Sequence, residues 1–174
     1  MKITKKLTIT AVLSAFALLS FVLEGLFPPL FIPGARLGIS NVFILIALLI
    51  VGKPYAYAVL VVKVILGSLF AGNISSSLYS LPAGVIALTV EMLLITFIKP
   101  LSIVSISTAG SVISLIVQNT VFCLVTGGTE YFIYLPYLAL IGSVVGAFVG
   151  IVVYFAIQFL PEKIYKPNYT EEKV

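Results

Sequence analysis

Residues 33–41 read Pro-Gly-Ala-Arg-Leu-Gly-Ile-Ser-Asn and lie between two long apolar segments. Gly34 and Gly38 flank Arg36, and glycine permits positive φ and close backbone approach. Pro33 fixes its own φ and favours an extended residue before it. The stretch therefore predicts a shaped loop that enters a helix. Arg36 either reaches lipid headgroups from this turn or belongs to a binding site, and the residues alone leave both interpretations open.

The composition places the whole chain in a bilayer. Of its 174 residues, 61% are hydrophobic and only 9% are charged, whereas soluble domains have about a quarter of their residues charged. The length indicates a single membrane domain over residues 1–174. The chain contains no His and no Asp, which removes most metal sites and acid–base catalytic arrangements. We therefore expect no enzymatic activity, no metal and no cofactor, and the scattered basic residues do not predict nucleic-acid binding.

A helix needs about 20 apolar residues to cross the hydrocarbon core of a membrane. Six segments are candidates for such a crossing, and the second is short for one. They are residues 7–27, 38–51, 54–70, 78–98, 101–125 and 132–160. The predicted fold class is therefore all-α and integral to the membrane, as a bundle of six transmembrane helices.

The loop cations predict how this bundle is oriented. Membrane proteins carry an excess of Lys and Arg on cytoplasmic loops. With a cytoplasmic N-terminus, eight lysines fall on the cytoplasmic side, namely Lys2, Lys5, Lys6, Lys53, Lys99, Lys163, Lys166 and Lys173. The outer loops then hold Arg36 and Glu130. We expect both termini to be cytoplasmic.

Three ionisable residues lie inside the predicted spans. Glu24 is near the outer end of the first, Lys63 is near the middle of the third, and Glu91 is near the middle of the fourth. A charge at the bilayer centre costs at least about 2.5–3.5 kcal/mol on insertion scales, so Lys63 and Glu91 should face protein or a wet cavity. Their similar predicted depth allows them to form an ion pair. This pair would either fix helix register or line a ligand cavity.

Four uncharged polar residues also belong to the outer half of the predicted bundle. They are Asn41, Tyr79, Gln118 and Asn119. Interhelical hydrogen bonding explains any one of them singly, but their shared depth with Arg36 and Glu24 favours a pocket. Arg36 is the first candidate, and Lys63 the second, for contact with an anionic or electron-rich part of a solute. The full predicted ligand site comprises Arg36, Lys63, Glu24, Asn41, Tyr79, Glu91, Gln118 and Asn119.

Small residues mark two faces where helices can approach closely in lipid. Ala11 and Ala15, with Ser14 between them, form one on the first span. The other is a glycine series in the last span, formed by Gly142, Gly146 and Gly150. Packing within the chain accounts for both by default. The alanine face is the better candidate for contact with another subunit.

Several of these motifs resemble one family of small membrane proteins. The chain combines the alanine-spaced first helix with Pro-Gly-Ala-Arg-Leu-Gly at 33–38, Lys-Val-Ile-Leu-Gly-Ser at 63–68 and Ser-Leu-Tyr-Ser-Leu at 77–81. This pattern is similar to that of the Gx transporter, or heptaprenyl diphosphate synthase component I, family. That family in turn resembles the substrate-binding S components of energy-coupling factor (ECF) transporters.

The resemblance implies a six-helix bundle of ECF S-component type in the bacterial cytoplasmic membrane, with an outward-facing pocket. It further implies docking through Ala11 and Ala15 onto a transmembrane coupling subunit driven by two ATPases. The solute would be a small organic molecule of a vitamin-like kind or an isoprenoid or quinone precursor. Family members often have Arg at the position of Lys63, and a His-Asn pair where this chain has Ser114 and Leu115. Lysine keeps the charge of arginine but loses its bidentate geometry.

The residues alone are compatible with three functions. A solute-binding transport subunit would need an external energy source, because the chain has no G-x-x-x-x-G-K-[ST] phosphate loop. An accessory subunit in heptaprenyl diphosphate metabolism would need a separate catalytic chain, because Mg²⁺-dependent condensation requires clustered carboxylates. A non-transporting membrane scaffold would tolerate neutral residues at Arg36 and Lys63. We expect the first.

Overall fold

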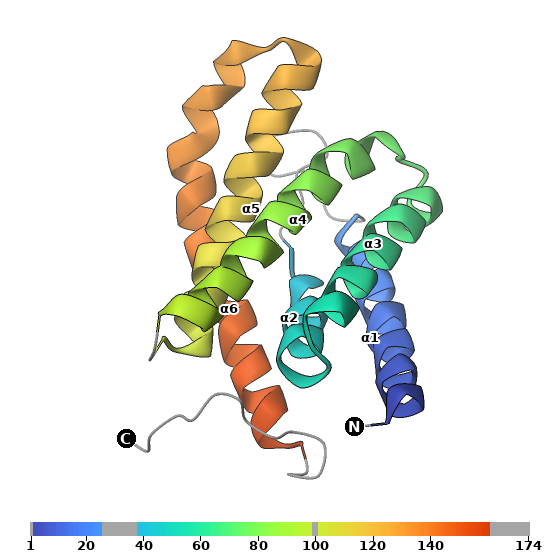
Figure 1. The fold of residues 1–174 in the computed structure, drawn as a ribbon. Helices are drawn as coiled ribbons and strands as arrows, with labels where there is room; N and C mark the ends of the chain where they lie inside the picture. The colour runs from blue at the N-terminus through green and yellow to red at the C-terminus, as the bar shows by residue number, and fades with distance from the viewer. Residues whose placement is uncertain (1, 26–37, 99–100, 161–174) are drawn as a thin grey trace.

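The computed structural model describes residues 2–25, 38–98 and 101–160, and all of its regular elements are helical. Figure 1 shows their arrangement. The α-helices are α1 (Ile3–Glu24), α2 (Asn41–Ile50), α3 (Lys53–Phe70), α4 (Ser75–Phe97), α5 (Ile103–Thr126) and α6 (Leu135–Gln158), with a 3-10 helix η1 (Thr129–Tyr134) before α6. The predicted all-α membrane fold is thus confirmed in its helix content and in the order of its helices.

Five helical segments in the described residues are long and apolar enough to cross a membrane. The exception is α2, whose 10 residues extend about 15 Å at ~1.5 Å per residue, half of the ~30 Å hydrocarbon core. The sequence already indicated a short second segment. A complete crossing at this position stays a prediction, and so does the cytoplasmic location of both termini.

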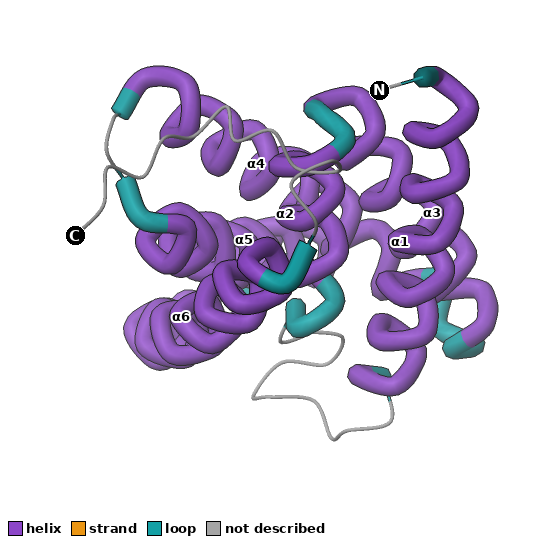
Figure 2. Tube along the Cα trace, turned by 90° about the horizontal axis from the view of Figure 1, so that it is seen from below, coloured by secondary structure: helices purple, strands orange, loops and turns teal. Residues whose placement is uncertain are grey.

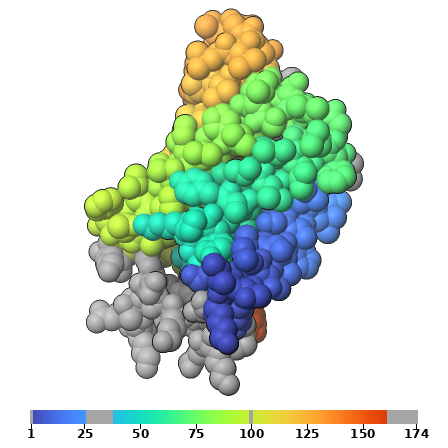
Figure 3. All heavy atoms as spheres, turned by 45° about the vertical axis from the view of Figure 1, so that its right-hand side comes forward, coloured from blue at the N-terminus to red at the C-terminus, as the bar shows by residue number. Residues whose placement is uncertain are grey.

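The helices alternate in direction through the bundle. Lys6 of α1 lies over the ring of Tyr55 in α3, and Phe21 near the end of α1 lies against Gly67 near the end of α3. These contacts show that α1 and α3 run parallel, side by side, as Figures 1 and 2 also show. The start of α1 and the end of α6 lie at the same end of the molecule (Figure 1). At the opposite end, the α5–α6 connection projects beyond the other helices (Figure 3).

The short helix α2 is the centre of the apolar core. It packs against α1, α3 and α6. All nine of its residues after Asn41 are apolar, and five consecutive ones, from Ile44 to Leu48, are buried. A helix that is apolar all round is typical of a fully enclosed position. Its start, at Asn41, is thereby held inside the bundle.

Helices α5 and α6 pack through the predicted glycine series. A Cβ atom at Gly146 would lie 2.6 Å from the Cα of Thr108, and one at Gly150 would lie 2.6 Å from the Cα of Val104. Both distances are far below van der Waals contact, so only glycine allows the two backbones to come this close. The glycine face therefore serves packing within the chain.

The last predicted segment differs from the structure at its start. The range 132–160 begins inside η1, and α6 itself begins at Leu135. Pro136 lies in the first turn of α6, where its fixed φ suits a helix start and its missing N–H costs nothing. Because Phe132 and Ile133 are also apolar, the sequence pattern does not reveal that α6 begins only at Leu135.

Candidate functional site

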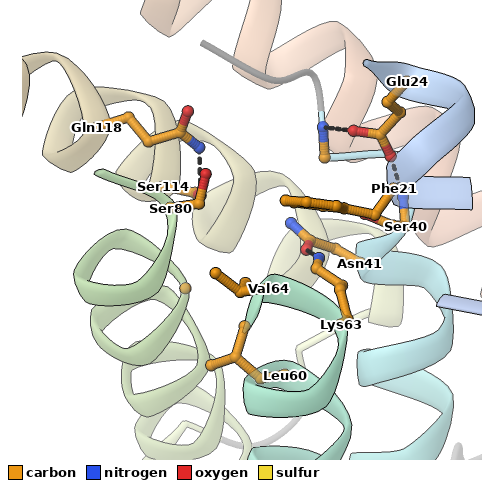
Figure 4. A pocket seen from close by; sticks show the side chains of 12 residues that line it. Phe21, Glu24, Ser40, Asn41, Leu60, Lys63, Val64, Ser80, Ser114 and Gln118 are labelled. Atoms are coloured by element: carbon orange, nitrogen blue, oxygen red, sulfur yellow. Dashed lines mark hydrogen bonds between the residues drawn. The ribbon is translucent and has the colours of Figure 1, made fainter. Parts of the chain in front are cut away.

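A polar pocket lies between the first five helices, close to the start of α2. Its lining comprises Phe21, Glu24, Gly38, Ser40, Asn41, Leu60, Lys63, Val64, Ser80, Gly84, Ser114 and Gln118. Figure 4 shows Glu24 of α1, Asn41 of α2 and Lys63 of α3 on one side and Ser114 with Gln118 of α5 on the other. The cavity, of about 20 Å³, has room for little more than a water molecule. A larger solute therefore needs its lining side chains to move.

Glu24 closes one end of the pocket by holding the segment that leads into α2. Its carboxylate accepts a hydrogen bond of 3.0 Å from the backbone N–H of Gly38 and one of 2.5 Å from that of Ser40. An anion is stabilised at a helix N-terminus, where backbone N–H groups lack partners within the helix. Gly38 has φ of 85°, a conformation that glycine adopts without strain. The loop-to-helix geometry predicted for this segment is confirmed from Gly38 onward.

Lys63 occupies the interior of the site. It is 4% exposed, and its Nζ donates a hydrogen bond of 2.7 Å to Oδ1 of Asn41. The same ammonium lies 5.7 Å from the centroid of the Phe21 ring, within the range of a cation–π contact. Gly67 makes this arrangement possible, because a Cβ there would overlap the Phe21 ring.

The opposite wall is formed by hydroxyl and amide groups. Gln118 and Ser114 lie one turn apart on α5, and the Gln118 amide donates to the Ser114 hydroxyl at 3.5 Å. Ser80 of α4 lines the same wall. Sequence reasoning selected Gln118 but missed Ser80, Ser114 and Ser40. Ser80 belongs to the Ser-Leu-Tyr-Ser-Leu motif at 77–81. The sequence pattern in this motif favours Tyr79 as the candidate, not Ser80.

Glu91 lies apart from this lining. It is 8% exposed, and its carboxylate contacts the backbone of α5 at Gly110, where a Cβ would overlap it. Lys63 donates a hydrogen bond to Asn41, and the direct ion pair between Lys63 and Glu91 stays a prediction.

Tyr79 and Asn119 belong to a second cluster, beside η1. The ring of Tyr79 meets that of Phe122 edge-on at 5.4 Å between centroids, and Phe122 meets Tyr131 at 4.9 Å. Asn119 Nδ2 donates to the backbone carbonyl of Tyr131 at 3.2 Å. These contacts join η1 to α4 and α5. Neither Tyr79 nor Asn119 lines the pocket. Contact of either residue with a ligand stays a prediction.

Two further predictions concern the loop and the first helix. Arg36 lies outside the described residues, so its role stays a prediction. Ala11 and Ala15 are exposed on α1, whereas Ser14 is buried and faces the bundle. The alanines therefore form an available surface, and Ser14 does not contribute to it.

The pocket lining combines charged, hydroxyl and amide groups with apolar side chains. No group of three or more His, Cys, Asp or Glu side chains that could hold a metal occurs among the described residues. The lining offers one ammonium, one carboxylate held by backbone N–H groups, three hydroxyls and two amides. Such a set suits recognition of a small polar solute, with Phe21, Leu60 and Val64 as the apolar part of the site.

These features define a multi-pass helical membrane protein with a polar pocket inside its bundle. The chain belongs to the heptaprenyl diphosphate synthase component I family, also described as the Gx transporter family, whose model matches residues 13–156. This finding confirms the family resemblance. No curated protein and no solved structure matches the chain significantly.

Proposed function

We propose that this protein is the substrate-binding membrane subunit, of S-component type, of an energy-coupling factor transporter in the bacterial cytoplasmic membrane. One observation carries the proposal: a charged and hydrogen-bonding pocket inside an apolar bundle, with Lys63 buried in it. Ionisable groups at membrane depth are expensive and commonly mark a solute path or site. The solute enters from the outer side and makes its contacts with the polar lining.

The exposed Ala11 and Ala15 supply the second element of the proposal. They leave a shallow surface on α1 on which a helix of a coupling subunit can approach closely. Energy comes from the two ATPases of the ECF module, because this chain lacks a phosphate-binding loop.

The family description favours a second candidate function. In it, the protein is an accessory membrane subunit that delivers an isoprenoid or quinone precursor to a separate prenyl diphosphate synthase. The absence of Asp from the chain leaves Mg²⁺-dependent condensation to that other subunit. The two candidates differ in their partner: an ECF module or a soluble synthase.

Co-purification separates these candidates. Tagged protein is isolated with the ECF module and with the synthase as alternative partners, using Ala11→Trp and Ala15→Trp against the wild type. Ala58→Trp is the matched control, because Ala58 is an exposed alanine on α3. We expect either α1 variant to lose the ECF module while remaining folded, and the α3 variant to retain it. Unchanged ECF binding by both α1 variants, or capture of the synthase alone, contradicts the S-component role.

Mass spectrometry of small molecules released from the purified wild-type protein identifies the solute. Arg36→Gln and Lys63→Met are compared with it, and both variants should retain less solute. Normal retention by both would contradict the predicted pocket contacts of Arg36 and Lys63, and no retained solute in the wild type would favour a scaffold without a transport function.

A further inference from the structure

Two hydroxyl groups of the pocket lack hydrogen-bond partners within the part of the chain that the structure describes. Ser40 is 0% exposed and Ser80 is 7% exposed, and neither Oγ atom has a partner among the described residues. A buried hydroxyl without a hydrogen bond is destabilising. Serines in helices ordinarily avoid this by donating to a carbonyl of the preceding turn, as Ser76 does toward the carbonyl of Asn73.

The two serines approach the same pocket from different elements. Ser40 directly precedes α2, where Glu24 holds its backbone N–H. Ser80 lies in α4, on the wall that also includes Ser114 and Gln118 (Figure 4). A polar group placed in the cavity would therefore have hydroxyls available from two sides.

The polar balance of the pocket favours an acceptor in that place. The Glu24 carboxylate already accepts two backbone N–H groups, and the positive end of the α2 dipole offsets its charge. The remaining lining is rich in donors, including the Lys63 ammonium and the two serine hydroxyls. Hydrogen bonds from such donors to an anion are shorter and stronger than those to a neutral acceptor.

We propose that Ser40 and Ser80 are direct ligand contacts, and that they receive the anionic group of a small organic anion such as a carboxylate. The inference rests on the proposed solute-binding function and deepens it by naming the substrate class and two contact residues. The cavity volume of about 20 Å³ holds little more than a water molecule, so the lining side chains must move for the anionic head group to reach both serines.

Cysteine labelling of the purified protein tests this inference without a known solute. In a Cys123→Ala background, Ser40→Cys and Ser80→Cys are treated with 2-sulfonatoethyl methanethiosulfonate and with its 2-trimethylammonioethyl counterpart. These reagents share a reactive group and differ in the sign of their charge. Ser75→Cys, exposed at the start of α4, corrects for intrinsic reactivity, and Ser76→Cys, buried but outside the pocket lining, is the buried control.

We expect both pocket cysteines to react, with the anionic reagent preferred about tenfold relative to Ser75→Cys, a size typical of one fixed charge in a partly dehydrated site. Ser76→Cys should stay unreactive. Equal rates or preference for the cation would overturn the anion assignment. If both pocket cysteines react as slowly as Ser76→Cys, the proposal that Ser40 and Ser80 line a solute path is overturned.

Alanine variants test the same inference without a labelling reagent, which would have to enter the pocket. Ser40→Ala and Ser80→Ala should leave the unfolding temperature unchanged or raised, because each removes an unsatisfied hydroxyl, whereas Ser76→Ala should lower it. A clear loss of stability in both pocket variants would show that these hydroxyls are satisfied within the protein and would overturn the inference. Neither experiment involves the ECF module, so loss of the ECF interaction in the Ala11→Trp test stays a separate result.

Discussion

The ring of Phe21 in α1 lies directly over Gly67 in α3, in the space that a Cβ atom at residue 67 would occupy. Phe21 is 2% exposed, and its ring also faces the Lys63 ammonium, 5.7 Å from the ring centroid. The missing side chain of one helix thus allows an aromatic ring of another to reach the buried cation. A small residue in the packing between α1 and α3 thereby shapes the polar site.

Gly67→Ala should destabilise the protein by about 1–3 kcal/mol, the usual cost of overpacking a filled core. The Phe21 ring must move to accommodate the new methyl group. Chemical unfolding in detergent measures the effect. Phe21→Leu in the same chain should recover part of the loss, because it removes the atoms that overlap. Full stability of Gly67→Ala alone would show that the ring is not confined as described.

Gly146→Ala should be destabilising for a different reason, by about 1–3 kcal/mol. Its Cβ would meet the backbone of α5 at Thr108 at 2.6 Å, and a backbone atom cannot rotate away as a ring can. Val144→Ala is the matched control on α6, because Val144 is 72% exposed and should tolerate the change. Thermal unfolding of the two variants compares them, and similar midpoints would contradict close α5–α6 packing.

Glu24→Gln should weaken the hold on the start of α2 while preserving its shape. The amide keeps one oxygen that can accept from Gly38 or Ser40, but it loses the charge that favours the helix N-terminus. We expect a loss of about 0.3–1 kcal/mol, rising toward ~2 kcal/mol in a partly buried site. Hydrogen exchange of the amides at residues 38–42 reports the effect locally. Slower exchange in the variant than in the wild type would contradict this role.

The helix ranges could be predicted from the sequence because apolar runs and Gly or Pro boundaries are local signals. The pocket was harder to predict. Glu24, Asn41, Lys63 and Gln118 were recognisable, since each is a polar residue in an apolar segment, and all four line the pocket.

Sequence gives the depth of a residue along a helix better than the direction in which its side chain points. Tyr79 and Ser80 are adjacent in α4, yet Ser80 lines the pocket and Tyr79 joins the aromatic cluster. Successive residues on an α-helix point about 100° apart, so an assignment based on depth cannot separate them. Serines were overlooked because most buried ones bond to their own backbone and carry no distinguishing pattern.

Lys63 has two candidate partners that could contribute to stability, Asn41 and Glu91. Its Nζ donates to Asn41 at 2.7 Å, while the Glu91 carboxylate lies against Gly110. Two double-mutant cycles compare the alternatives: Lys63→Met with Asn41→Leu, and Lys63→Met with Glu91→Gln. Because a hydrogen bond to a charged group contributes about 1.5–3 kcal/mol, we expect the first coupling energy to fall in this range and the second to be smaller.

Chemical unfolding of the wild type, the single variants and the double variants gives both coupling energies under identical conditions. Lys63→Met alone should be the most damaging single change, since it leaves the buried Asn41 acceptor without its donor. A larger coupling to Glu91 than to Asn41 would favour the direct ion pair predicted from the sequence. In that case Lys63 would serve the register of α3 against α4 rather than the pocket.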